Sequence, residues 1–123
     1  MFVTADQLVL HLTADTLLQT EWMWLGKRKD WVAAGVHAAT YTAAFVLLTT
    51  SWQALAFICA AHFAVDWWSL GRRLVWVKNG CRKSILPGPA CGGKTAAVTS
   101  WQYAVVDAVL HVVCNAAAIA LLG

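Results

Sequence analysis

The chain has 123 residues, of which 60% are hydrophobic and 12% are charged, and its formal net charge is +3. Ordinary soluble domains carry about a quarter of their residues as charged side chains, so this composition argues against a water-soluble domain and predicts a single integral membrane domain. The small positive charge is localised in two segments, which is typical of loops that flank a membrane and does not indicate nucleic-acid binding.

Four segments are long and apolar enough to cross a bilayer as helices, which requires about 20 mostly apolar residues. They lie at about residues 5–25, 31–49, 52–70 and 101–122. The pattern T-x-x-Q, typical of a helix capping box, opens the first segment at Thr4 and recurs at Thr50 and Thr99 before the third and fourth. The sequence therefore predicts an all-α fold, a four-helix transmembrane bundle that forms one domain.

Lysine and arginine occur in two of the connections between these segments. The first connection carries Lys27, Arg28 and Lys29. The second, at about residues 71–99, carries Arg72, Arg73, Lys78, Arg82, Lys83 and Lys94. By the positive-inside rule both connections face the cytoplasm, so both chain termini are predicted on the non-cytoplasmic side. The long basic connection is expected to contact the headgroups of membrane lipids.

The second connection contains GPACGGKT, Gly88 to Thr95, which matches the phosphate-binding pattern G-x-x-x-x-G-K-[ST]. That motif binds a nucleotide when a strand leads into it and a helix follows within a parallel sheet. Pro87 and Pro89 interrupt the entry, and the chain has no room for such a sheet. We therefore predict no nucleotide site.

Histidine and aspartate recur four residues apart on the predicted helices, a spacing that places them on one face of a helix. The pairs are His11 with Asp15, His62 with Asp66, and Asp107 with His111, and the second helix adds His37. The same lines of spacing also contain Gln7, Gln19, Tyr41, Tyr103 and Asn115. At 1.5 Å per residue, the histidines and aspartates lie about 6–20 Å from the predicted cytoplasmic helix ends. If the lines face one another, they meet inside the membrane.

The cost of burying these groups indicates what they do. An ionised aspartate at the centre of a membrane helix costs about 2.5–3.5 kcal/mol, so three of them require compensation. Imidazole and carboxylate together suit zinc, iron or manganese, and inward-facing ligands on opposed helices build di-metal carboxylate bundles. The sequence therefore predicts a site for a divalent transition metal, with enough ligands for two ions. The predicted ligands are His11, Asp15, His37, His62, Asp66, Asp107 and His111, with Gln19 and Tyr103 expected beside them.

Two other roles for the same residues stay open. Hydrogen-bonded Asp–His pairs can hold helices together, each contributing about 0.6–2 kcal/mol. A line of histidines and aspartates can also form a proton or ion pathway.

The run HLTADTLLQTEWMWLGKRK, the lone His37, HFAVD and DAVLH together resemble a family of small bacterial and phage membrane proteins, catalogued as domain of unknown function 3307. The resemblance covers nearly the whole chain apart from the connection Cys81–Lys94. It implies a small multi-pass protein of the bacterial inner (cytoplasmic) membrane, with Gln19 and the seven histidines and aspartates as its characteristic polar positions. The chain is also loosely similar to proteins classed as membrane-bound metal-dependent hydrolases.

These observations lead to two expectations about function. The first is a metal-dependent hydrolase that acts on a lipid or lipid-linked substrate, because the site lies near a basic connection and lipid headgroups. No nucleophile motif is present, so the catalytic residues are unknown. The alternative is a non-enzymatic membrane protein, either an ion or proton conductor or a membrane-interaction subunit. The sequence leaves open whether the chain forms a homo-oligomer.

Overall fold

The computed structural model describes residues 2–78 and 96–123, with the side chains of 96–100 excepted. Every element in these residues is helical, which confirms the predicted all-α class. In chain order they are α1 (Ala5–Leu12), a π-helix η1 (Thr13–Leu17), α2 (Glu21–Gly26), α3 (Trp31–Ala44), a 3₁₀ turn η2 (Phe45–Leu47), α4 (Trp52–Trp67), α5 (Leu70–Lys78) and α6 (Ala96–Leu122). The GPACGGKT segment lies outside the described residues.

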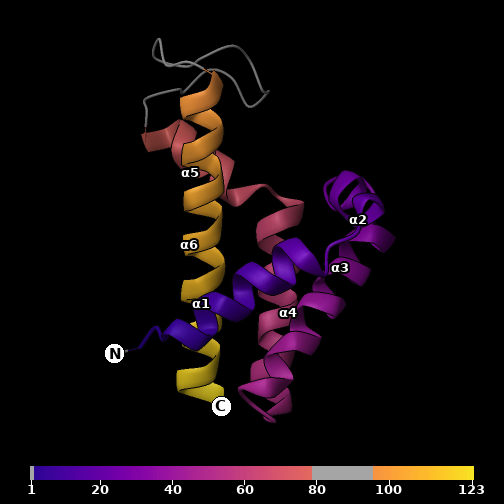
Figure 1. Ribbon diagram of the computed structural model, residues 1–123, viewed down its shortest axis with the longest axis vertical. Coiled ribbons are helices and arrows are strands. Elements are labelled where there is room, and N and C mark those ends of the chain that lie inside the picture. The colour runs from indigo at the N-terminus through magenta and orange to yellow at the C-terminus, as the bar shows by residue number, and fades with distance from the viewer. Residues whose placement is uncertain (1, 79–95) are drawn as a thin grey trace.

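The long helix α6 organises the molecule (Figure 1). Helices α1, α4 and α5 all pack against α6, and α3 packs against the other side of α4. Helix α2 lies at the edge of the molecule, packed on α3. Both termini and the connection between α3 and α4 lie toward one end of the long axis, whereas α2 and α5 lie toward the other half (Figure 1).

The first predicted helix, at 5–25, is interrupted. The α-helical hydrogen bonding of α1 gives way at Thr13 to the π-helix, which ends at Leu17. The hydroxyl oxygen of Thr20 then accepts the backbone N–H of Met23 (3.3 Å) and starts α2 as a separate helix. A threonine side chain that caps a new helix offers the backbone an alternative to continuing the old one, which explains the break.

The predicted helix starts are partly correct. The Thr4 hydroxyl caps α1 by accepting the backbone N–H of Gln7, as predicted (3.4 Å). Helix α4 is capped by Ser51 instead of Thr50, because the Ser51 hydroxyl lies within reach of the Ala54 N–H (3.4 Å). Thr99 lies within α6, which begins at Ala96, so it is not a cap.

The third predicted helix, at 52–70, ends at Trp67, and the first part of the predicted connection at 71–99 is helical. Ser69 has a positive φ of 49°, and the chain turns there by 56° from α4 into α5. Helix α5 then approaches α6 closely at Gly71. A Cβ atom at this position would lie 3.0 Å from the Cα and backbone N of Asp107, so glycine permits the contact.

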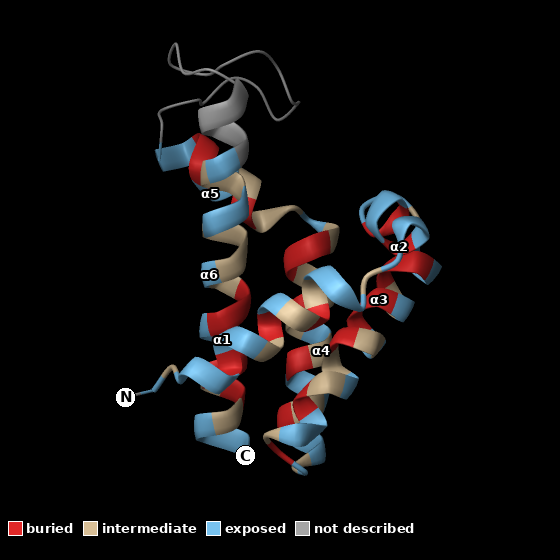
Figure 2. Ribbon diagram, in the orientation of Figure 1, coloured by how far each residue is buried: buried red, intermediate tan, exposed pale blue. Residues whose placement is uncertain are grey.

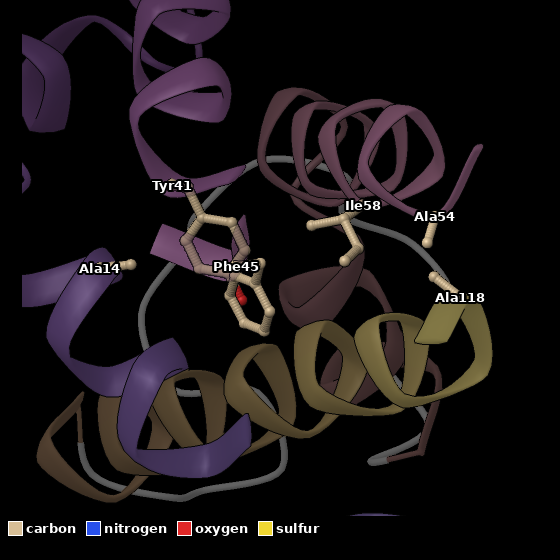
Figure 3. Close-up of a cluster of buried hydrophobic side chains, with 6 residues drawn as sticks. All are labelled: Ala14, Tyr41, Phe45, Ala54, Ile58 and Ala118. Carbon is tan, nitrogen blue, oxygen red and sulfur yellow. The ribbon is translucent and has the colours of Figure 1, made fainter. Parts of the chain in front are cut away.

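Figure 2 maps the buried and exposed residues onto the fold. All four histidines are at most 2% exposed, and one cluster of buried hydrophobic residues consists of Ala14, Tyr41, Phe45, Ala54, Ile58 and Ala118 (Figure 3). On α6, by contrast, Val105, Val109 and Val113 are 42–53% exposed. Polar groups inside and apolar groups outside are typical of a helical protein surrounded by lipid.

One helix among the described residues is by itself long and apolar enough to cross a membrane, at Trp101–Leu122 within α6, and only 28% of its most apolar window is buried. The bent pair formed by α4 and α5 meets the same criterion when taken as one broken span. The segment Trp31–Leu47 is apolar but shorter.

Candidate metal centre

The predicted ligands come from five helical elements and meet in the middle of the fold. His11 lies at the end of α1 and Asp15 in the π-helix. The remaining ligands lie on the longer helices: His37 on α3, His62 and Asp66 on α4, and Asp107 and His111 on α6. The four histidines and Asp66 are 1–2% exposed. The structure therefore brings together all seven residues in three overlapping groups.

The first group consists of Asp15, His37, His62 and Asp66, and we call it the four-ligand group. Their ligand atoms all lie within 4.8 Å of one another. Nε2 of His37 lies 3.1 Å from Asp15 Oδ1 and 3.2 Å from Asp66 Oδ2. Nε2 of His62 lies 2.9 Å from His37 Nε2 and 3.3 Å from Asp66 Oδ2. Two imidazoles and two carboxylates that converge in this way can hold a divalent metal ion.

Two further groups share members with the first. One consists of His11, Asp15 and His111, and the other of Asp66, Asp107 and His111. Asp15 and Asp66 therefore link the four-ligand group to its neighbours.

The ring of His111 is oriented as a metal ligand would be. Its Nδ1–H donates to the backbone carbonyl oxygen of Asp107 (2.9 Å), which leaves Nε2 as the ring nitrogen that can bind a metal. That Nε2 lies 3.9 Å from Oδ1 of Asp66. Both atoms are buried without a hydrogen-bond partner among the described residues. A metal ion between this nitrogen and this carboxylate oxygen would give both atoms a partner, so these residues fit a metal.

The π-helix places Asp15. A π-turn widens the helix by one residue per turn, and such turns are frequent at functional sites. Asp15 Oδ1 thereby reaches His37 on α3, and Asp15 also joins the group with His11 and His111. An unbroken α-helix over 5–25 would direct the residues that follow Asp15 differently.

Tyr41 and Asn115 support the ligands from within the core, a role that the sequence analysis did not assign. Asn115 Nδ2–H donates to the Tyr41 hydroxyl (2.5 Å), which is also bonded to Nδ1 of His11 (2.8 Å). The Tyr41 ring stacks on His62, with centroids 3.7 Å apart. The sequence feature that connects both residues with the site is spacing, because Tyr41 follows His37 by four residues and Asn115 follows His111 by four.

Lys27 is part of the site, which the sequence analysis missed. It was assigned to the basic connection that flanks the membrane, but its side chain is 8% exposed. Its Nζ lies 3.1 Å from Asp66 Oδ2 and 3.7 Å from Asp15 Oδ1. No spacing pattern distinguishes Lys27 from Arg28 and Lys29, both of which are exposed.

Tyr103 and Gln19 are the two residues predicted beside the ligands, and contacts are described for Tyr103. The Tyr103 hydroxyl accepts the indole N–H of Trp76, and the Arg72 guanidinium lies 5.6 Å from the Tyr103 ring centroid. These contacts hold α5 against α6. Gln19 lies between the π-helix and α2, and its Oε1 is buried without a hydrogen-bond partner in the described part of the chain.

No family model, curated protein or solved structure matches this chain. The resemblance to domain of unknown function 3307 therefore stays a prediction based on its motifs. The identity of the site rests on its geometry: seven buried or half-buried histidines and aspartates from five helical elements, arranged so that they can hold a metal ion.

Proposed function

We propose that this chain is a multi-pass protein of the bacterial inner membrane that binds a divalent transition metal, zinc, iron or manganese, in the four-ligand group. The convergence of Asp15, His37, His62 and Asp66 from three separate helical segments carries this proposal. A second ion is proposed for the neighbouring group of Asp66, Asp107 and His111. There the unpartnered Asp66 Oδ1 and His111 Nε2 face each other.

The membrane arrangement is supported by two features. Apolar side chains cover the outer face of α6, where hydrocarbon would lie. The two basic segments at α2 and α5 lie in the same half of the molecule, away from the termini (Figure 1). Both features suit the four-helix transmembrane bundle with its basic segments in the cytoplasm. Membership of the domain of unknown function 3307 family is proposed with it, on the motifs of the sequence.

The proposed activity is hydrolysis of a lipid or lipid-linked ester. A metal in this position would polarise a phosphoryl or carbonyl oxygen and lower the pKa of a bound water to about 7. His37 and His62 would hold it through Nε2, while Asp15 and Asp66 would neutralise its charge. The basic residues Arg73 and Lys78 on exposed positions of α5 would attract an anionic headgroup to this half of the protein.

A non-enzymatic role is the second candidate, and Lys27 favours it. Its buried ammonium supplies a positive charge to Asp15 and Asp66 without any metal. In that case the histidines and aspartates form a hydrogen-bonded network that holds helices together or conducts protons or ions.

Metal content of the detergent-purified full chain tests the proposal. The unaltered protein, expressed with metal supplements, should contain stoichiometric zinc, iron or manganese by elemental analysis. Asp15→Asn and Asp66→Asn should keep the helical content but bind the metal at least about tenfold more weakly, because an amide is a poorer ligand than a carboxylate. Asp107→Asn should lower the content by one ion per chain and leave the four-ligand group loaded.

Asp6→Asn is the matched control, because Asp6 is exposed in the first turn of α1 and belongs to none of the three groups. It should retain the full metal content. A metal-free parent protein, or equal metal content in all four variants, would reject the metal centre and leave the non-enzymatic role.

A further inference from the structure

We propose that Lys27 is a built-in competitor for the metal, whose ammonium bridges Asp15 and Asp66 until an ion displaces it, so that Lys27 sets the metal affinity of the four-ligand group. This inference rests on the proposed metal site.

The competition follows from shared oxygen atoms. Lys27 Nζ lies 3.1 Å from Oδ2 of Asp66, the same oxygen that lies 3.2 Å from His37 Nε2 and 3.3 Å from His62 Nε2. The ammonium also lies 3.7 Å from Oδ1 of Asp15, the oxygen that His37 contacts at 3.1 Å. An ion held by the four ligands would bind these two oxygens. The ammonium and the ion would therefore neutralise the same two carboxylates in the same place.

With Asp107 assigned to the second proposed ion, charge balance within the four-ligand group makes simultaneous occupancy by Lys27 and a metal unfavourable. Two carboxylates and the ammonium have a formal charge of −1, from −2 and +1. A divalent ion added to all three gives +1, whereas a divalent ion that replaces Lys27 gives 0. The side chains of Lys27 and Asp66 are 8% and 2% exposed, so water screens this excess charge poorly. Metal binding is consequently coupled to the departure of the ammonium.

The position of Lys27 in the chain permits that departure. Lys27 follows Gly26, the last residue of α2, and its backbone N–H remains bonded to the carbonyl oxygen of Met23 (2.8 Å). Helix α2 lies at the edge of the molecule (Figure 1), and the neighbouring Arg28 and Lys29 are exposed. A flexible four-carbon side chain can therefore reach water from this site by rotation about its own bonds.

Co²⁺ titration of the detergent-purified full chain, followed by visible absorption, tests the inference. The binding step that is lost in Asp15→Asn identifies the four-ligand group. Lys27→Gln and Lys27→Met should raise the Co²⁺ affinity of that step at least about tenfold, because they remove a positive charge beside the ion. Lys27→Arg keeps the charge and should bind no more tightly than the unaltered protein. Lys29→Gln, an exposed lysine in the same turn, should leave the affinity unchanged.

A second measurement uses the unaltered chain. Saturation with Co²⁺ should increase the rate at which an amine-reactive reagent modifies Lys27, measured by mass spectrometry, while Lys29 reacts at a constant rate.

Unchanged or weaker Co²⁺ binding by folded Lys27→Gln would overturn the inference and leave the metal site intact. If Lys27→Gln and Lys27→Met fail to fold, unchanged Lys27 reactivity on Co²⁺ saturation would overturn it. Absence of Co²⁺ binding in every protein, the parent included, would reject the metal site itself, and the inference with it.

Discussion

The orientation of His62 is determined by ring packing. Its ring stacks on Tyr41, with centroids 3.7 Å apart and planes 18° apart, and it also contacts His111, with centroids 4.3 Å apart. Its Nδ1 is buried without a hydrogen-bond partner within the described residues. A histidine that binds metal usually has its second ring nitrogen held by a hydrogen bond. Here the stacked Tyr41 directs Nε2 toward Asp66 instead.

Tyr41→Phe tests the hydroxyl network at the residue scale. The substitution keeps the stacked ring but removes the hydroxyl that bonds to His11 and Asn115. Both partners are at most 2% exposed, so the loss should lower the free energy of unfolding by about 1–3 kcal/mol. Chemical unfolding in detergent, followed by circular dichroism, measures this change.

Adding Asn115→Leu to Tyr41→Phe provides the control. Removing the amide donor together with its acceptor eliminates one unpaired buried group, so the double variant should be less destabilised than the sum of the two single variants. Additive losses would show that the bond between Tyr41 and Asn115 contributes nothing.

At the scale of the helices, two breaks in the chain build the site. The π-helix carries Asp15 into the core, and the new start at Thr20 turns α2 so that Lys27 points back toward Asp15 and Asp66. Similarly, the turn at Ser69 lays α5 along α6, next to Asp107. The Thr20 hydroxyl starts α2 by capping it, whereas the second break is marked by the positive φ of Ser69.

Gly71→Ala tests the contact between α5 and α6. The added Cβ would meet the backbone of Asp107 at 3.0 Å, and backbone atoms of a helix cannot yield as a flexible side chain can. Overpacking of this kind should destabilise the fold by about 1–3 kcal/mol, measured as unfolding in detergent.

Gly35→Ala is the matched control within α3. A Cβ there has no atom within 4 Å, so the helix preference of alanine should leave stability unchanged or raise it by up to about 1 kcal/mol. Equal effects of the two substitutions would contradict close packing at Gly71.

At the scale of the whole molecule, a group of polar side chains lies in the interior while many large apolar side chains lie on the outside. Nine polar or charged residues are buried, among them Lys27 and Asn115, while 25 large apolar side chains in the described residues are exposed. This distribution suits the proposed membrane environment. Surrounded by hydrocarbon, it places each kind of group in a compatible environment.

The orientation in the membrane is tested by labelling Cys81 and Cys91, which lie outside the described residues, in the basic connection. We expect this connection in the cytoplasm because of its lysines and arginines. A membrane-impermeant maleimide added to intact spheroplasts should therefore leave both cysteines unmodified, in a variant that lacks Cys59 and Cys114. Permeabilised cells are the positive control and should show full labelling. Modification from outside would reverse the topology.

The sequence by itself determined the helical class and the members of the predicted site. Apolar runs long enough for helices leave few other folds, which explains why the α-helical class was correct. The i, i+4 spacing of His11 with Asp15, His62 with Asp66 and Asp107 with His111 indicates shared helix faces, because this spacing is a local property of a helix. Local properties are the ones that a single sequence can specify.

Tertiary structure alone decided which of these faces meet and where the charge of the site is balanced. The fold of α5 against α6 depends on contacts between residues far apart in the chain, such as Gly71 with Asp107. Lys27 looks like its exposed neighbours in sequence, and its burial follows from the direction in which α2 leaves the π-helix. A salt bridge between Lys27 and Asp66 has no local signature, because its energy arises only after two distant helices have packed.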